Sequence, residues 1–247
     1  MNEVSQLDGS VSFLTSHWGV CELISRAEEF HLQLIHRSRI LMVNRLLPPA
    51  ARILDLGGAN APLYHMGYQH PFQELVMVDL PKEERHEMYR DIDVAVDAQG
   101  RVSIHYSDMT HLPMLPDESF DLVWSGQSIE HVDLHAGANM CKEAFRLLKR
   151  GGYFCLDTPN RALTKIHTSD WHGGFIHPEH KHEYTNDELR SLLEATGFEI
   201  EVNMGVCEMP KTVETGKFHY TDFVVGNPVT PQPEGAYCIY FGCVRPY

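Results

Sequence analysis

ARILDLGGANAPLY, residues 51–64, is the stretch that decides the fold. Its apolar run, residues 52–56, contains an acid and is followed at once by Gly57 and Gly58. Glycines at the end of a buried strand allow a ligand or another backbone segment to approach closely. The stretch therefore predicts a strand, a tight turn and a binding site at the carboxyl end of that strand.

Apolar segments and helical patterns alternate along the rest of the chain. This alternation is typical of a parallel sheet with helices on both faces, which binds its ligands at the carboxyl ends of the strands. Helical patterns cover residues 19–47, 137–149 and 185–196, and a capping signal, Thr185 to Glu188, opens the last of them. Further strands are expected at 75–79, 102–106, 120–125, 153–157, 199–204, 218–225 and 236–244.

Composition and charge exclude several classes of protein. The formal net charge of -14 argues against nucleic acid and anionic membrane surfaces as partners. No apolar run reaches the ~18 residues of a membrane-spanning helix, and the polar start MNEVSQLDGS is unlike a signal peptide. The six cysteines are scattered, which indicates reduced thiols and a cytoplasmic protein, although a Cys238–Cys243 disulfide stays open.

Two acids mark the ends of the first two expected strands. Asp55 lies at the end of the first strand and Asp79 at the end of the second. A carboxylate in the second position is well placed to accept hydrogen bonds from a ribose diol, which points to a ribose-bearing cofactor. The turn from Gly57 onward does not fit the GxGxxG fingerprint, so a nicotinamide oxidoreductase is the disfavoured alternative.

The order of these segments resembles the class I methyltransferases that use S-adenosylmethionine. The quoted motifs are LDLGGANA, VMVDL, YSDMTHLPMLPDESFDLVWSGQSIEHV, KRGGYFCLDTPN and HKHEYTNDELRSLLEATGF, which together cover roughly residues 50–200. The resemblance implies an α/β fold with a doubly wound, seven-stranded, mostly parallel sheet. It also implies an N-terminal helical cap, residues 1–49, on a single methyltransferase domain, residues 50–247, with an inserted loop at 165–182.

The resemblance places the cofactor along the ends of the first four strands. Asp79 would bind the ribose, Asp108 the adenine amino group, and Met109 the adenine ring. Asp55 could instead cap a turn, and Met109 could belong to the core. The full set implied to contact S-adenosylmethionine is Asp55, Gly57, Gly58, Ala59, Asp79, Leu80, Asp108, Met109, Ser125 and Gln127. Ala59 and Ala61 stand where the family often has glycine.

Two histidines are the candidate catalytic residues. His131, in SIEHV, matches a histidine that lies close to the transferred methyl group, and an imidazole can act as a general base near neutral pH. Its alternative role is to hold a helix start by hydrogen bonding. His180, in the tail block, is the second candidate. The surrounding loop could be a lid over a polar acceptor or a metal site, but we predict no metal ligand there. Its histidines are His167, His172, His177, His180 and His182.

The predicted reaction is methyl transfer to oxygen, with a small-molecule or glycan hydroxyl as acceptor. The TPN turn at 158–160 and the tail block resemble sugar and glycan methyltransferases. A quinone, phenol or natural-product acceptor is the first alternative. The alanines at 59 and 61 also leave open a non-catalytic, cofactor-binding or regulatory subunit, and the histidine loop leaves open a metalloenzyme.

Overall fold

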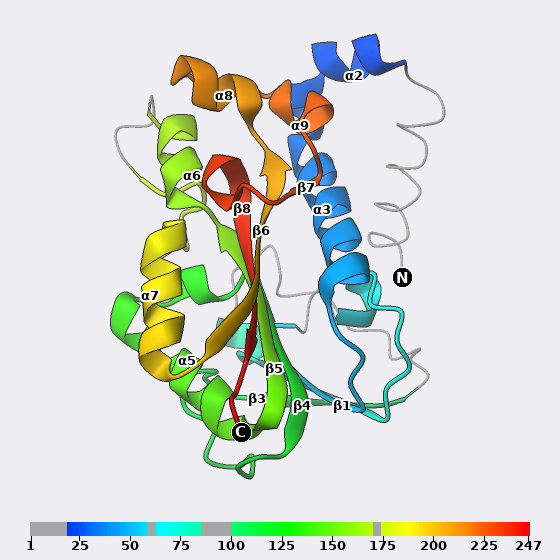
Figure 1. Cartoon of the computed structure of the whole chain (residues 1–247), viewed down its shortest axis with the longest axis vertical. Coiled ribbons are helices and arrows are strands. Elements are labelled where there is room, and N and C mark those ends of the chain that lie inside the picture. Colours follow the sequence, from blue (N-terminus) through cyan, green and yellow to red (C-terminus); the bar gives the residue numbers. More distant parts are fainter. Residues whose placement is uncertain (1–18, 59–62, 85–99, 170–173) are drawn as a thin grey trace.

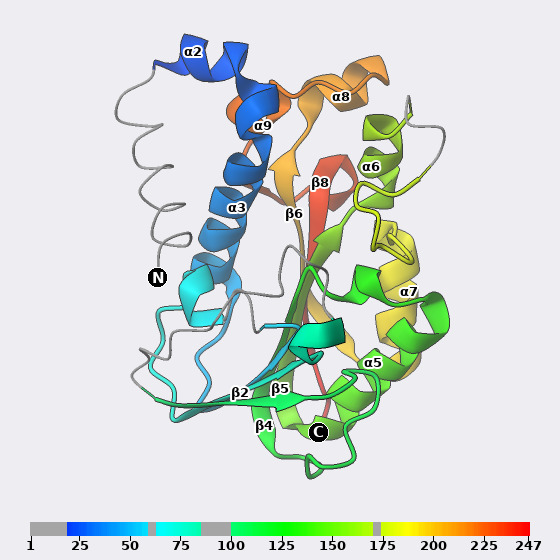
Figure 2. The same cartoon turned by 180° about the vertical axis from the view of Figure 1, so that it is seen from behind.

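A twisted β-sheet forms the centre of the molecule, with helices on both of its faces (Figures 1 and 2). The computed structural model describes residues 19–58, 63–84, 100–169 and 174–247. The strand order is β3-β2-β1-β4-β5-β8-β6-β7. Strands β1 to β5 pair in parallel, and β8 runs antiparallel to both β5 and β6. The doubly wound α/β prediction is therefore confirmed.

The strands and helices have the following bounds. The strands are β1 (Arg52–Leu56), β2 (Glu74–Asp79), β3 (Arg101–Tyr106), β4 (Phe120–Gly126), β5 (Leu148–Pro159), β6 (Glu199–Glu208), β7 (Val229–Thr230) and β8 (Ala236–Val244). The α-helices are α2 (Val20–Ser25), α3 (Ala27–Leu46), α5 (Leu134–Leu147), α6 (Arg161–His167), α7 (Asn186–Thr196), α8 (Pro210–Thr215) and α9 (Asp222–Val225). The 3-10 turns are η1 (Leu63–Met66), η2 (Lys82–Glu84), η3 (Ile129–His131) and η4 (Pro233–Gly235).

The two faces of the sheet bury separate apolar clusters. Because successive side chains of a strand point to opposite faces, Leu54 joins the cluster under α5 and α7, whereas Ile53 joins the cluster under α3. In β4, Val123 belongs to the first cluster and Trp124 to the second. Both faces of the central strands are therefore covered, which explains their continuous apolar sequence.

Local sequence signals set the ends of α7 as expected. The Thr185 hydroxyl accepts from the backbone N–H of Glu188, and the Glu188 carboxylate accepts from the backbone N–H of Thr185. Gly197 ends the helix with a φ of 109°, a left-handed conformation that glycine adopts without strain. The start and the stop predicted for this helix are confirmed.

Two details of the predicted sheet and helix bounds were wrong. The sheet has eight strands rather than seven, because the two residues of β7 add to the edge of β6. Helix α5 ends at Leu147, and the chain to Lys149 and beyond already belongs to a longer β5. The prediction of reduced cysteines is confirmed: Cys238 and Cys243 are free and lie in different apolar clusters, so no disulfide joins them.

The strand expected at 218–225 is a turn followed by α9. Buried Asp222 explains the difference, because its carboxylate accepts from the backbone N–H groups of Lys211 and Thr212 at 3.2 and 2.7 Å. These bonds tie the segment to the start of α8 instead of to a neighbouring strand. The apolar side chains that suggested a strand serve an aromatic cluster instead.

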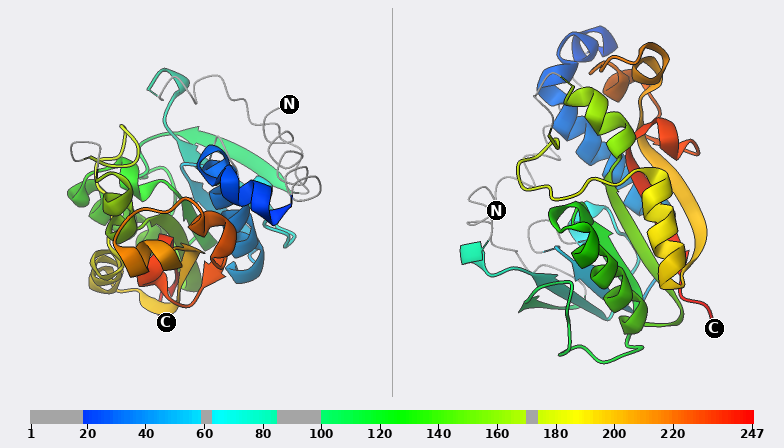
Figure 3. Two further views of the ribbon diagram at one scale, coloured as in Figure 1. Left: turned by 90° about the horizontal axis from the view of Figure 1, so that it is seen from above. Right: turned by 90° about the vertical axis from the view of Figure 1, so that its left-hand side faces the viewer.

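A cap of short helices rises above the carboxyl ends of the strands (Figures 1 and 3). Helices α2, α6, α8 and α9 and the start of α3 form it, and α3 also packs against β6. The cap thus combines the N-terminal helices with segments from the second half of the chain. None of the helices in the described ranges combines the length and apolar composition needed to span a bilayer.

The aromatic cluster of the cap is built around His167. Its Nδ1 lies 2.6 Å from the Tyr237 hydroxyl, its Nε2 lies 2.8 Å from the Tyr220 hydroxyl, and its ring stacks on Phe218 at 3.8 Å. Burial, with a smaller contribution from His31, lowers the pKa of His167 to about 4. The titratable groups that act on it are His31, Glu183, Tyr220 and Tyr237.

We expect this histidine to make the protein acid-sensitive. Because its pKa is lower in the folded than in the unfolded state, its contribution is present above about pH 6.5 and is lost as the pH falls toward 4. In His167→Gln, the unfolding free energy should fall by about 1–2 kcal/mol less over this pH window than in the unsubstituted protein. Urea denaturation at a series of pH values measures it. His135→Gln, on the exposed face of α5, is the matched control, and an unchanged slope in His167→Gln would contradict the prediction.

Candidate functional site

The glycine turn after β1 is held by Asp55 and Ser128. Asp55 is buried, and its Oδ2 accepts from the Leu63 backbone N–H at 2.9 Å, which ties the two sides of the turn together. Gly57 has a φ of 79°, and a Cβ there would overlap the Ser128 hydroxyl. A Cβ on Gly58 would overlap the Asp55 carboxyl group. Both positions therefore require glycine for local reasons, whatever binds beside them.

Burial changes the ionisation of Asp55. It raises the pKa of the carboxyl group to about 7, although the hydrogen bond from Leu63 acts in the opposite direction. Asp55 thus holds the backbone of the turn through its bond with Leu63, which is the alternative structural role considered from the sequence. The predicted contact residue Ala59 falls outside the described residues.

The acids after β2 and β3 lie at neighbouring strand ends. Asp79 ends β2 beside Tyr106 of β3, and its Oδ1 accepts from the Leu80 N–H at 2.8 Å. Asp108 follows β3 and is exposed, with Oδ1 accepting from the Thr110 N–H at 2.8 Å. Met109 is partly buried and packs against the core, as its alternative interpretation allowed. The first three strand ends therefore present their polar groups at one edge of the sheet.

The turn after β4 brings Ser125 and Gln127 to the same edge. Ser125 is fully buried, and its hydroxyl has no hydrogen-bond partner among the described residues. Gln127 has a φ of 55°, and its Nε2 donates to Asp157 at 2.9 Å. The hydroxyl of Ser128 donates to the Leu56 carbonyl at 3.0 Å, which links this turn to the glycine turn.

These residues fit a nucleoside-bearing cofactor. The glycine turn leaves backbone beside the site, an acid ends β2, and a buried hydroxyl without a partner lies at the end of β4. Asp79, Asp108 and the backbone near Ser125 are the groups that would hold the ligand. A ligand group that reached Ser125 would remove the cost of its unsatisfied hydroxyl.

A buried ion pair that the sequence analysis missed lies under this edge. Arg39 of α3 donates from Nε to Asp157 Oδ2 at 2.6 Å and from its second terminal nitrogen to Oδ1 at 3.0 Å. Asp157 of β5 is fully buried. Asp157 could have been singled out from the sequence, because it is an acid near a strand end, as Asp55 and Asp79 are. Nothing local in the helix sequence singles out Arg39.

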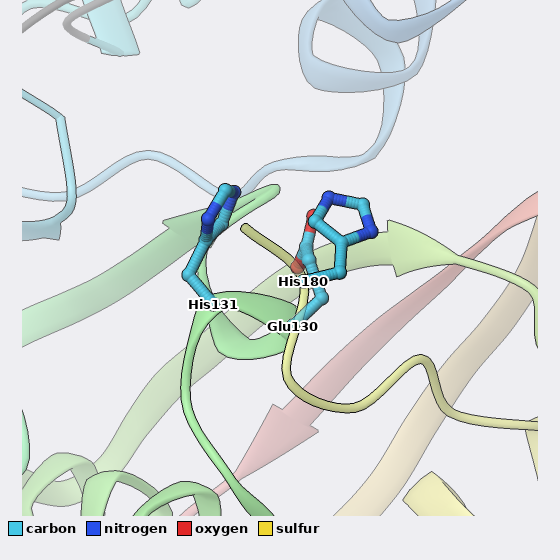
Figure 4. Close-up of side chains that lie close together, drawn as sticks. All are labelled: Glu130, His131 and His180. Carbon is cyan, nitrogen blue, oxygen red and sulfur yellow. The ribbon is translucent and has the colours of Figure 1, made fainter. Parts of the chain in front are cut away.

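The two candidate catalytic histidines are neighbours. The rings of His131 and His180 lie edge to face, with centroids 4.9 Å apart. The backbone carbonyl of Glu130 accepts from the N–H groups of Lys181 and His182 at 2.8 and 3.2 Å, which holds the loop before α7 against η3. Two histidines that are distant in the sequence are thereby brought to the carboxyl ends of β4 and β5 (Figure 4).

Two buried glutamates surround this pair. His180 Nδ1 lies 2.8 Å from Glu183 Oε1, and the second oxygen of Glu183 accepts from the Thr164 hydroxyl and from Arg161. Glu130 Oε2 accepts from the Thr158 hydroxyl at 2.9 Å. The sequence analysis did not single out either glutamate, although Glu183 follows His180 by only three residues.

Burial and neighbouring groups set the charge of this cluster. Burial favours protonation of Glu183, but the hydrogen bonds from His180 and Thr164 outweigh it and lower the pKa of the carboxyl group. Glu183 is therefore the acceptor, and Nδ1 of His180 carries the hydrogen. Burial, then His180 and His177, lowers the pKa of His131 to about 4, and burial raises the pKa of Glu130 to about 7.

The remaining loop histidines separate. His167 joins the aromatic cluster of the cap, His182 lies edge to face with Tyr184, and His177 lies near His131 and His180. His172, together with Trp171, falls outside the described residues. The loop therefore contributes to at least two different places, and His180 and His177 are the members that reach the strand ends.

Comparison with protein families identifies the domain. A family model described as a methyltransferase domain matches residues 28–202. The chain belongs to this methyltransferase family. The class I methyltransferase assignment made from the sequence is thereby confirmed.

Two curated relatives are named as probable S-adenosylmethionine-dependent methyltransferases. A protein of Mycolicibacterium smegmatis, named a probable S-adenosylmethionine-dependent methyltransferase, is 42% identical over 106 residues, which are 43% of this chain and 38% of that protein. A Mycobacterium tuberculosis protein of the same description is 37% identical over 107 residues, 43% of this chain and 35% of the relative. The matched segment thus spans well under half of the relatives.

Solved structures support the fold. A Thermotoga maritima methyltransferase, described as a possible histamine N-methyltransferase, has a TM-score of 0.57 and 21% sequence identity, covering 91% of this chain and 96% of its own. A Mesorhizobium loti S-adenosylmethionine-dependent methyltransferase has a TM-score of 0.59 and 18% identity, covering 84% and 98%. At these identities the likeness bears on the architecture alone.

Proposed function

We propose that this methyltransferase transfers a methyl group from S-adenosylmethionine to a hydroxyl oxygen of a sugar, a glycan or another small molecule. The observation that carries the choice of oxygen is the contact between His180 and Glu183. An acceptor hydroxyl must lose its proton during methylation, and a buried carboxylate that binds Nδ1 leaves Nε2 as the proton acceptor. Family membership and the relatives' names support the choice of cofactor.

The cofactor roles are assigned to the strand ends. Asp79 would accept hydrogen bonds from the ribose hydroxyls, Asp108 would accept from the adenine amino group, and Met109 would pack on the ring. Leu80, Ser125, Gln127 and the turn from Asp55 to Ala59 would line the rest. When bound, S-adenosylmethionine supplies a methyl group attached to a positively charged sulfur.

The acceptor side is assigned to the two histidines. His180 would remove the hydroxyl proton through Nε2, and His131, held neutral at pH 7 by burial, would bind the acceptor oxygen beside it. Positioning the acceptor in line with the methyl group supplies the rest of the rate enhancement. We further propose that the described part of the predicted cap, residues 19–49, covers this site; residues 1–18 lie outside the described residues. We also propose a cytoplasmic location and, on the net charge of -14, no nucleic-acid partner.

Loss of Asp79 tests the cofactor assignment. Asp79→Ala should weaken binding of S-adenosylmethionine by about 100-fold or more, because two hydrogen bonds to a charged group are lost. Isothermal titration with S-adenosylmethionine, its demethylated product and NAD measures the affinities. Asp187→Ala is the matched control, because it removes the same charge from the exposed first turn of α7.

The outcomes separate the competing functions. Binding of both sulfur compounds that is lost in Asp79→Ala and kept in Asp187→Ala supports the proposal. A panel of free sugars, glycans, phenols and quinones, followed by release of the demethylated product, then identifies the acceptor class. Binding of NAD with no binding of S-adenosylmethionine would favour the alternative of a nicotinamide oxidoreductase. Tight binding of S-adenosylmethionine with no turnover on any acceptor would favour a non-catalytic subunit.

A further inference from the structure

The cluster of Glu130, His131 and His180 offers three metal-ligating side chains at one place (Figure 4). Each has one ligand atom within 4.8 Å of the others. His131 and Glu130 come from η3, and His180 comes from the loop before α7, so the fold itself assembles the three. We propose that they bind one divalent transition-metal ion of the zinc type.

Glu130 provides the first specific argument. Its side chain is fully buried, and Oε2 is used by Thr158. Oε1 has no hydrogen-bond partner among the described residues. A buried carboxylate oxygen without a partner costs free energy, and a bound cation would satisfy it.

His180 provides the second argument. Its imidazole is nearly buried, with 7% of the side chain exposed, and Nδ1 is engaged by the Glu183 carboxylate at 2.8 Å. This is the arrangement of metal-ligating histidines in general, in which an outer carboxylate fixes the ring and the other nitrogen binds the metal. Thr164, Arg161 and the backbone N–H of Ile176 in turn hold Glu183.

The ligand types select the metal. Two imidazoles and one carboxylate suit zinc, iron or nickel, whereas magnesium and calcium prefer sites built from oxygen. In a tetrahedral zinc site the ligand atoms lie about 3.4 Å apart, so separations of up to 4.8 Å would close by at most about 1.4 Å on binding. Three protein ligands leave a coordination position open for a further oxygen.

The inference deepens the proposed function, on which its catalytic consequence rests. An acceptor hydroxyl at the open position would have its pKa lowered by the cation. In the loaded protein, His131 and His180 would hold the metal rather than take the proton. The acceptor hydroxyl, made more acidic by the cation, would release its proton to solvent, and its oxygen would form the bond to the methyl group as the bond from methyl to sulfur breaks. Binding itself can be tested without turnover.

Zinc binding to the full chain is the decisive measurement. Protein freed of metal by a chelator is dialysed against zinc chloride, and elemental analysis gives the stoichiometry. We expect one tightly held zinc per chain, no comparable binding of magnesium, and visible absorption bands typical of a low-coordinate site when cobalt(II) replaces zinc. His180→Gln and Glu130→Gln should weaken zinc binding by more than about 100-fold, and Glu183→Gln by about 10–100-fold.

Controls separate a specific site from histidine-rich surface binding and from misfolding. His135→Gln removes an exposed imidazole and should leave the bound zinc unchanged. Circular dichroism of each metal-free variant verifies folding. The cobalt spectrum of the unsubstituted protein tests the metal site independently of any variant. Failure to retain zinc, or equal retention in His180→Gln and Glu130→Gln, overturns the metal site. Titration of S-adenosylmethionine into the same metal-free protein shows separately whether the proposed function stands.

Discussion

Replacing Arg39 by methionine should lower the free energy of unfolding by about 3–5 kcal/mol. Methionine keeps much of the length and apolar surface of the arginine but leaves the fully buried Asp157 carboxylate without its bidentate partner. Breaking a buried ion pair from one side is costly, because the remaining charge stays out of water. Urea denaturation monitored by circular dichroism measures the change.

Two further variants test this reason for the loss. Arg101→Met removes an arginine whose side chain is 74% exposed from its ion pair with Glu74, and should cost less than about 1 kcal/mol. Adding Asp157→Asn to Arg39→Met removes the buried charge and should recover part of the lost stability. If the double variant were no more stable than Arg39→Met, lost packing rather than the unpaired charge would explain the effect.

Replacing His180 by glutamine should lower the rate of methyl transfer by about 100- to 10,000-fold. Glutamine can still donate a hydrogen bond to Glu183, but it can neither take a proton from the acceptor at neutral pH nor replace an imidazole ligand. The measurement is release of the demethylated cofactor, with the best acceptor found in the panel. We expect the loss in kcat, with little change in the affinity for S-adenosylmethionine.

The affinity for the cofactor is the internal control of this experiment. An equal weakening of S-adenosylmethionine binding would mean that His180 shapes the site rather than acting on the acceptor. His135→Gln controls for the loss of one imidazole. Unchanged turnover in His180→Gln would remove His180 from the mechanism and leave His131 as the remaining candidate base.

Sequence periodicity located β1, β2, β4 and β8 well, because each is a continuous apolar run bounded by turn residues. The start of α7 was also predictable, because Thr185 and Glu188 form its capping box within a single turn. The segment 218–225 was wrongly predicted as a strand, because its aromatic residues are typical of strands. Their actual partners, such as His167 and Tyr237, are far away in the sequence.

The sequence by itself determined the order of the five parallel strands along the chain, the glycines of the first turn, and the acids at the strand ends. These features depend on neighbours in the chain, whose contacts local stereochemistry fixes. Only the tertiary structure decided that Arg39 meets Asp157 and that His180 lies beside His131 and Glu130. Those contacts join helices, strands and loops that the sheet brings together, and their stability comes from burial that no local pattern encodes.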